Sequence, residues 1–297
     1  MFLFENDPEF YRPFILKLFP KLNYAEIKMH QGWHSIAIEV DNRLIFKFPK
    51  NEAAKQALMK EAALLAIIQP RIKMHVPEIE LHQESKDTPL FSIHKKISGE
   101  ALETKHYEVL PENARNKLAK KIAQFYVQLH SLNPEELMAA SAGKIENWHT
   151  SNEIIEHAIP LLNKELKLIA KDIVDKYIAL PPDPYGTTYG FFDGHGWNMA
   201  FDHKRKVLNG IYDFADSGFG SLHQEFIYTN FIHPDLTERV ITVYETLSKR
   251  SIERNRVNIL TGYHRLSEIK ETITMPEHLP EMILHFEKWT QHMPSVS

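Results

Sequence analysis

Two acids and an amide beside glycines form the densest group of potentially reactive side chains in the sequence. Asp193 and Asn198 belong to the run Asp193-Gly194-His195-Gly196-Trp197-Asn198, and Asp213 follows an apolar run at residues 207–212. Magnesium prefers hard oxygen ligands and usually takes one or two protein carboxylates together with nucleotide phosphates. Asn198 and Asp213 therefore suit a magnesium–phosphate centre, while Asp193 could accept a proton from an attacking hydroxyl. The alternative is that these side chains only cap turns in polar loops.

A lysine and a glutamate earlier in the chain form a second candidate pair. Lys47 lies between Phe46 and Phe48 in an apolar run, where an unpaired ammonium group would be costly. Because side chains alternate across a strand, Lys47 faces away from both phenylalanines. Glu61 lies in the helix predicted next and can reach back to Lys47. A strand lysine held by a helix glutamate and directed at nucleotide phosphates is the arrangement of protein kinases; the alternative is two solvated side chains that do not meet.

The elements around Lys47 are predicted to be a small sheet with one prominent helix. Residues 36–40 and 44–48 are β-prone runs separated by Asp41-Asn42-Arg43, which has the composition of a hairpin turn. Residues 52–68 are rich in alanine, leucine, lysine and glutamate, which predicts a helix that ends before Pro70. Residues 76–81 and 90–97 are further strand candidates. Apolar residues at helical spacing predict an amphipathic helix over residues 113–132.

The rest of the chain is predicted to be mostly helical. Residues 133–151 have no strong periodicity and are predicted to be a loop or insertion. A helix is expected over residues 154–179, ended by Pro181 and Pro182. Two short strands are predicted at residues 197–201, which include Asn198, and at residues 207–212, which Asp213 follows. Residues 225–289 return to helical patterning. A small α/β lobe followed by a mostly helical lobe is the simplest architecture.

Composition excludes several classes of protein. The 297 residues are 43% hydrophobic and 25% charged, with a net charge of −4, so disorder is not expected and there is no electrostatic case for nucleic acid or anionic lipid as a partner. The absence of cysteine excludes disulfides, thiolate zinc sites and cysteine nucleophiles. The first residues do not have the pattern of a signal peptide, and the apolar run 62–68 is too short to span a bilayer. We expect a cytoplasmic protein.

In this order, the motifs resemble those of the aminoglycoside phosphotransferase family, part of the protein-kinase-like superfamily. The resemblance runs from about residue 25 to residue 230 and rests on a series of segments: Gly32-Trp33-His34-Ser35, Arg43-Leu44-Ile45-Phe46-Lys47-Phe48-Pro49-Lys50, Ile97-Ser98-Gly99-Glu100-Ala101-Leu102, Leu129-His130-Ser131-Leu132, the Asp193–Asn198 run, and Gly210-Ile211-Tyr212-Asp213-Phe214-Ala215-Asp216. The resemblance implies an α+β, bilobal protein-kinase-like fold. Its strand-rich nucleotide-binding lobe would cover residues 1–97, and its larger helical catalytic and substrate-binding lobe residues 98–297.

The resemblance also implies roles for the polar residues. Lys47 would bind the α- and β-phosphates of ATP or GTP, with Glu61 fixing its position. Asp193 would orient the acceptor hydroxyl and take its proton, and Asn198 and Asp213 would hold Mg²⁺.

Further positions receive supporting roles from the same resemblance. Ser35 falls in the turn that covers the phosphates, and Ile97 and Tyr212 match positions that sandwich the nucleotide base. His195 matches a loop histidine that is more often architectural than chemical, and Asp216 an acid that stabilises the loop after the metal ligand.

The sequence departs from the family pattern beside two motifs. Phe191-Phe192 replaces the usual His-Gly or His-Asn before the catalytic aspartate, and Gly220-Ser221-Leu222 replaces Gly-Asp-Pro, so that a loop-anchoring acid is predicted to be missing. No long activation segment follows Asp213, which favours a small acceptor over a protein.

The predicted function is therefore transfer of the γ-phosphate of ATP or GTP to a hydroxyl of a small molecule. The leading acceptor is an aminoglycoside-type antibiotic or similar cationic sugar. Acids of the helical lobe are compatible with a cationic acceptor, or are a solvated surface: Glu225, Asp235, Glu238, Glu245, Glu268 and Glu271. The alternatives are a kinase of a cellular amino alcohol or sugar, and a nucleotide- or ligand-binding protein that has lost turnover.

Overall fold

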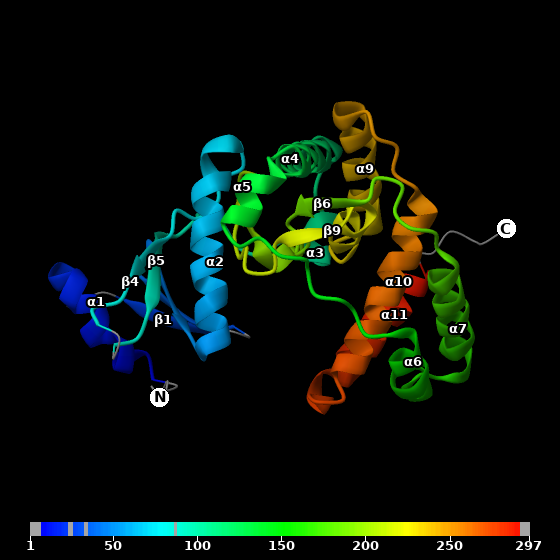
Figure 1. The fold of residues 1–297 in the computed structure, drawn as a ribbon, viewed down its shortest axis with the longest axis horizontal. Helices are drawn as coiled ribbons and strands as arrows, with labels where there is room; N and C mark the ends of the chain where they lie inside the picture. Colours follow the sequence, from blue (N-terminus) through cyan, green and yellow to red (C-terminus); the bar gives the residue numbers. More distant parts are fainter. Residues whose placement is uncertain (1–6, 23–25, 33–34, 86–87, 292–297) are drawn as a thin grey trace. The chain divides into compact units, whose positions relative to one another are not determined.

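The structure, a computed structural model, describes residues 7–22, 26–32, 35–85 and 88–291. The chain divides into two units, each made of three separate segments, and Figure 1 shows their helices and strands. The first unit comprises Met1–Ala101, Ser131–Gly143 and Trp197–Ala215, and the second comprises Leu102–His130, Lys144–Gly196 and Asp216–Ser297. The two predicted lobes meet at a single boundary between residues 97 and 98, whereas each unit here contains three segments. The predicted boundary stays a prediction.

The first unit is built on an antiparallel sheet with the strand order β1-β2-β3-β5-β4. Its strands are β1 (Ile27–Gln31), β2 (Ser35–Val40), β3 (Leu44–Pro49), β4 (Glu80–His82) and β5 (Phe91–Lys95). The predicted hairpin is confirmed as β2–β3. At its turn Asp41 and Asn42 have φ angles of 51° and 53°, and both aspartate and asparagine tolerate this left-handed conformation.

Apolar residues of β2, β3 and β5 form one core with the N-terminal helices η1 (Pro8–Tyr11) and α1 (Arg12–Leu18). Tyr11, Phe46 and Phe48 are completely buried in it. Lys47 alternates with the two phenylalanines and pairs with Ala37 on β2 and Ser92 on β5. Burial of its neighbours on one face of the sheet therefore directs the lysine to the opposite face.

The prominent helix α2 spans Glu52–Ile68, as predicted. Asn51 caps it by accepting a hydrogen bond from the Ala54 N–H at 2.8 Å. The helix then continues into the short turns of η3 (Gln69–Arg71), which contains Pro70.

Other parts of the first unit differ from prediction. Of the predicted strand 76–81, only the last two residues belong to a strand, β4 (Glu80–His82), because Pro77 has no N–H to donate to a neighbour. The predicted loop 133–151 contains the short helix α5 (Pro134–Ala139), which Asn133 caps. The predicted strands after residue 196 are confirmed as the antiparallel pair β7 (Met199–Asp202) and β8 (Val207–Ile211), preceded by η6 (Gly196–Asn198).

The second unit is mostly helical. It contains α3 (Thr104–Glu108), α4 (Glu112–His130), α6 (Ser151–Glu153), α7 (Lys164–Ala179), α8 (Ile227–Asn230), α9 (Pro234–Ser248), α10 (Arg254–Glu271) and α11 (Leu279–Gln291). One small antiparallel pair, β6 (Thr187–Gly190) with β9 (Gly218–Ser221), flanks the Asp193 loop and is followed by η7 (Leu222–Phe226). Helix α4 packs on α9, and α10 packs on α7 and α11.

The helix predicted over residues 154–179 is not continuous. A π-helical turn at Ile154–Ala158 and a 3₁₀ turn at Ile159–Leu161 precede α7, which starts after the cap Asn163. Pro160 causes the break, because it has no N–H for a helical hydrogen bond. The helical patterning predicted over residues 225–289 is confirmed. None of the helices in the described residues combines the length and apolar character needed to cross a membrane.

Candidate active site

Lys47 lies between two carboxylates in the first unit. Its Nζ is 3.1 Å from Oε2 of Glu61 on α2 and 2.8 Å from Oδ1 of Asp213, which follows β8. Glu61 is buried at 2% exposure, whereas the Asp213 side chain is 45% exposed. The predicted pair of Lys47 and Glu61 is therefore present, and Asp213 joins it from a distant part of the sequence.

The two neighbouring carboxylates keep this lysine protonated. Burial lowers the pKa of Lys47, but the carboxylates of Glu61 and Asp213 raise it by more, so that its pKa stands above the ordinary lysine range. The ammonium group is thus a permanent positive charge in a partly enclosed setting, which suits the binding of phosphate oxygens.

The second oxygen of Glu61 holds the backbone beside Asp213. Its Oε1 accepts a hydrogen bond from the Phe214 N–H at 2.9 Å, and both groups are buried. Asp213 itself has a φ of 68°, a conformation that side chains other than glycine adopt rarely and only when the surroundings fix them. One buried carboxylate therefore positions the lysine and also the turn that carries the predicted metal ligand.

Asn198 and Asp213 lie at the same end of the β7–β8 pair. Met199 pairs with Ile211, and the Tyr212 N–H donates to the Asn198 carbonyl at 3.1 Å. The residues just before β7 and just after β8 are therefore neighbours. An amide and a half-exposed carboxylate are oxygen donors suited to Mg²⁺, which takes its remaining ligands from phosphates and water. Among the described residues no three His, Asp or Glu side chains form a ready-made metal cluster.

The predicted phosphate-covering turn is described only at its two ends. The Gly32 N–H donates to the Ser35 carbonyl at 3.0 Å, and Lys50 Nζ donates to the Gly32 carbonyl at 2.6 Å. Trp33 and His34 lie outside the described residues. Ser35 is buried at the start of β2, and its part in nucleotide binding stays a prediction.

The two residues predicted to sandwich the base also belong to the first unit. Ile97 is buried beside Gly210 of β8: a Cβ on that glycine would lie 2.9 Å from Ile97 Cγ2. The Tyr212 hydroxyl donates to the Trp197 carbonyl at 2.5 Å, which fixes the ring near the end of the β7–β8 pair. Their contact with a base stays a prediction.

Asp193 lies in the second unit, on the loop between β6 and η6. Its backbone carbonyl accepts from the His195 N–H at 2.8 Å, and its Oδ1 is 3.4 Å from Nε2 of the same histidine. Burial lowers the pKa of His195 well below its ordinary value, which favours a neutral ring beside the carboxylate. The His195 side chain is therefore buried in the protein, with one nitrogen near Asp193. Asp216, in contrast, is exposed.

The loop that carries Asp193 has an anchoring acid, although Gly220-Ser221-Leu222 does not supply one. Glu225, completely buried in η7, accepts hydrogen bonds from the Phe191 N–H at 2.9 Å and the Phe192 N–H at 3.0 Å. These are the residues just before Asp193, and Phe192 has a φ of 51°. Both phenylalanine side chains are buried, so the unusual pair is part of the core, and Glu225 holds its backbone.

A further contact extends this anchor to α4. Nε2 of His130 lies 3.3 Å from the Glu225 carboxylate, and its Nδ1 lies 2.8 Å from the Tyr244 hydroxyl of α9. Glu225, predicted to be available to a cationic acceptor or to lie on a solvated surface, is instead completely buried and in contact with His130. No local sequence signal singles out Glu225, because the polar residues His223 and Gln224 precede it and the apolar residues begin only at Phe226.

The chain is similar in sequence pattern and in fold to known phosphotransferases. The sequence model described as the phosphotransferase enzyme family matches residues 27–258. The structure of an aminoglycoside 2′-phosphotransferase-IIIa in complex with GDP is similar at 20% identity, with a TM-score of 0.81, over 96% of this chain and 99% of that one.

Two further solved structures have the same fold. The gentamicin complex of APH(2″)-IIa is 17% identical, with a TM-score of 0.65 over 98% of each chain. A macrolide 2′-phosphotransferase from Brachybacterium faecium is 10% identical, with a TM-score of 0.62 over 97% of this chain and 99% of that one. The predicted protein-kinase-like fold is confirmed. Because the family model covers most of the chain, the protein belongs to the phosphotransferase enzyme family.

Proposed function

We propose that this chain transfers the γ-phosphate of ATP or GTP to a hydroxyl of a small molecule, with Mg²⁺ as the metal ion. The observation that carries the proposal is Lys47 held between Glu61 and Asp213, because one of these two carboxylates is buried and the other is half-exposed. The buried carboxylate can keep the lysine in place while the exposed one turns to a metal ion. Magnesium, when bound, would neutralise phosphate charge.

Each polar residue then has a distinct task. Lys47 binds the α- and β-phosphates, and Asn198 and Asp213 supply oxygen ligands to the metal. Asp193 orients the acceptor hydroxyl and receives its proton. The hydroxyl oxygen forms a bond to the γ-phosphorus as the bond from that phosphorus to the bridging oxygen of the nucleotide breaks, leaving ADP or GDP. Positioning and charge neutralisation provide most of the rate.

Loop anchoring favours an active enzyme over a binding protein without turnover. The feature that suggested lost turnover was Phe191-Phe192, since it replaces the polar pair of the family pattern. The backbone of that pair is nevertheless fixed by the Glu225 carboxylate, and the residues required for phosphoryl transfer are all present. A loop held in this way can keep Asp193 in position.

The acceptor is proposed to be an aminoglycoside-type antibiotic or another cationic sugar. Kanamycin, gentamicin and streptomycin occur in solved complexes of similar fold, although the identities of those proteins to this chain are 21% or lower. These complexes and the family match support an acceptor with several hydroxyl groups.

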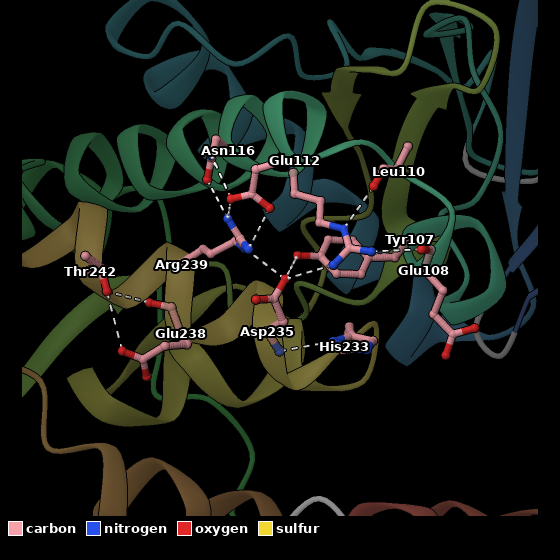
Figure 2. A network of polar contacts seen from close by, with 11 residues as sticks. Tyr107, Glu108, Leu110, Glu112, Asn116, His233, Asp235, Glu238, Arg239 and Thr242 are labelled. Carbon is pink, nitrogen blue, oxygen red and sulfur yellow. Dashed lines mark hydrogen bonds and ion pairs between the residues drawn. The ribbon is translucent and has the colours of Figure 1, made fainter.

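The acids of the helical lobe that could attract a cationic acceptor are engaged within the chain, and this favours a second candidate. Figure 2 shows Asp235 between Tyr107 at 2.6 Å and Arg239 at 2.8 Å. The others pair as follows: Glu225 with the Phe191 and Phe192 N–H groups, Glu238 and Glu245 with Arg254, Glu268 with Arg265, and Glu271 with His149. Acids neutralised in this way attract a polycation weakly. A less cationic acceptor, such as a cellular sugar or amino alcohol, is therefore the second candidate.

The test is an acceptor panel with the purified protein, Mg²⁺ and either ATP or GTP, read by mass spectrometry as the addition of one phosphate. The panel should contain aminoglycosides, macrolides, neutral sugars and amino alcohols. Asp193→Asn serves as the control, because a contaminating kinase would survive this substitution. Phosphorylation that the control lacks supports the proposal and names the acceptor class. No transfer and no nucleotide hydrolysis with either nucleotide would contradict it.

A further inference from the structure

A buried arginine in α10 stands behind the loop that carries Asp193. Arg265 is 7% exposed, and its guanidinium carbon lies 3.4 Å from the centre of the Phe231 ring. Its Nη1 is 3.0 Å from the Glu268 carboxylate, one turn along the same helix. A desolvated guanidinium stacked on an aromatic face is held both by its charge and by its flat shape.

The aromatic ring passes this contact on to the loop. Phe231 packs on the ring of His195, with 4.7 Å between ring centres and 44° between planes. The other edge of that histidine presents Nε2 to Asp193 Oδ1 at 3.4 Å. A continuous series of contacts therefore leads from Glu268 and Arg265 to the carboxylate proposed to take the acceptor proton.

Other aromatic side chains close the sides of this stack. Tyr228 meets the His195 ring edge to face at 5.2 Å, and His264 lies 5.3 Å from Phe231 and 5.6 Å from Tyr228. The His195 ring therefore has little room to rotate without displacing its neighbours.

We infer that Arg265 is a positioning residue for phosphoryl transfer, which acts through Phe231 to fix the ring of His195 beneath Asp193. The inference rests on the proposed function, since it concerns the carboxylate assigned as proton acceptor. The charged and titratable groups around His195 are Asp193 on its own loop, Tyr228, and His264, Arg265 and Glu268 on α10. After burial, which lowers the His195 pKa most, Glu268 raises it while His264 and Arg265 lower it. The arginine thus also helps to keep the ring neutral.

The test is Arg265→Lys, which keeps the positive charge opposite Glu268 but removes the flat group that stacks on Phe231. Arg256→Lys is the matched control: Arg256 is also buried in α10, at 5% exposure, but it bonds Glu253 and the Pro181 carbonyl. We expect Arg265→Lys to lower kcat by about tenfold or more with the nucleotide KM within about twofold, since a small displacement of a reacting group slows transfer strongly. Arg256→Lys should leave kcat unchanged.

A second measurement does not depend on activity. In spectra of ¹⁵N-histidine-labelled protein, assigned by a His195→Gln variant, Arg265→Lys should shift the His195 ring signals and Arg256→Lys should not. If Arg265→Lys does not fold, Phe231→Leu tests the same chain of contacts, because it removes the ring between arginine and histidine. Phe231→Leu should shift the same signals.

The two measurements separate failure of the inference from failure of the proposed function. Ring signals that stay in place in Arg265→Lys or Phe231→Leu would overturn the inference, whatever the enzyme's activity. Absence of phosphoryl transfer in the unmodified protein would overturn the proposed function and with it the catalytic part of the inference. If transfer occurs, a variant with both Arg265→Lys and Phe231→Leu should be no slower than Phe231→Leu alone, because both substitutions interrupt the same series of contacts. Losses in kcat that add up in the double variant would also overturn the inference.

Discussion

In each unit a single buried carboxylate holds the backbone beside a candidate site residue. In the first unit Glu61 bonds Lys47 with one oxygen and the Phe214 N–H with the other, and in the second unit Glu225 bonds the Phe191 and Phe192 N–H groups. Each is buried, and an unmade hydrogen bond costs most for a buried group. Both therefore fix the backbone next to an aspartate that has a role in the proposed reaction.

We expect Glu61→Ala to weaken nucleotide use and also to destabilise the protein. Lys47 would keep only its bond to Asp213, and the buried Phe214 N–H would lose its acceptor, at a cost of about 1–3 kcal/mol. The nucleotide Michaelis constant and the melting temperature measure the two effects. Glu61→Gln should raise the Michaelis constant similarly but destabilise less, since its amide oxygen can still accept from Phe214. Glu52→Gln is the control, because Glu52 is exposed on the same helix. If Glu61→Ala had the same Michaelis constant and melting temperature as Glu52→Gln, the role assigned to Glu61 would be contradicted.

Asp193 and Asp213 should respond differently to the same substitution. Asp193→Asn should leave magnesium–nucleotide affinity nearly unchanged and lower turnover by about 10²-fold or more, because only the proton acceptor is lost. Asp213→Asn should weaken magnesium-dependent nucleotide binding and abolish turnover with it. Calorimetric nucleotide titrations at several magnesium concentrations, paired with transfer rates, measure this. Equal loss of binding in both variants would show that the two residues do not have separate tasks.

At the scale of elements, a glycine allows the segment 97–101, which links β5 to the second unit, to lie close against β7. Gly99 has a φ of 140°, and a Cβ there would lie 2.5 Å from the Ala200 carbonyl carbon. Beside it Glu100 and Phe201 exchange backbone hydrogen bonds of 3.0 and 2.9 Å. This close approach joins the linker to the strand that follows Asn198.

Gly99→Ala should therefore destabilise the protein by about 2 kcal/mol or more, through overlap with β7 and an unfavourable φ. Urea denaturation measures the loss. Gly143→Ala is the control, because nothing lies within 4 Å of a Cβ at that position. If the two variants were equally stable, the close approach of linker and strand would be absent in solution.

At the scale of the whole molecule, carboxylates that are paired or hydrogen-bonded make the free energy of unfolding depend on pH. Asp183 accepts hydrogen bonds from the His223 ring, the His223 N–H and the Tyr185 N–H, at 2.8, 3.0 and 2.9 Å. Burial raises the pKa of Asp183, but these bonds lower it by more, so its pKa lies below the ordinary value. Neighbouring arginines likewise hold down the pKa values of Asp235, Glu245 and Glu268.

A carboxylate with a lowered pKa in the folded state stabilises above its unfolded pKa, and that stabilisation is lost as the pH falls toward the folded value. We therefore expect the free energy of unfolding to be steady at neutral pH and to fall below about pH 4, where free carboxyl groups titrate. Denaturant titrations from pH 7 to pH 3 measure this. Asp183→Asn should be less stable at pH 7 and show a shallower fall; Asp172→Asn, an exposed residue on α7, should follow the unmodified protein. An equally steep fall in Asp183→Asn would show that Asp183 does not contribute.

Local chemistry determined much of this protein. The β2–β3 hairpin, α2 with its cap and most of the C-terminal helices follow from strand alternation, turn residues, capping and helical periodicity, all of which act over a few residues. The pairing of Lys47 with Glu61 was also predictable, because a strand lysine next to an amphipathic helix has few partners within reach. Predictions were wrong where proline interrupted a pattern, as at Pro77 and Pro160.

Only the tertiary structure decided which distant groups meet. Nothing local shows that Asp213 reaches Lys47, that Glu225 anchors Phe191 and Phe192, or that Arg265 stacks on Phe231. A buried charged group needs a partner of opposite charge or a hydrogen bond, but that requirement does not say from where along the chain the partner comes. The choice is made when helices and strands pack, because packing alone brings residues that are far apart in sequence within hydrogen-bonding distance.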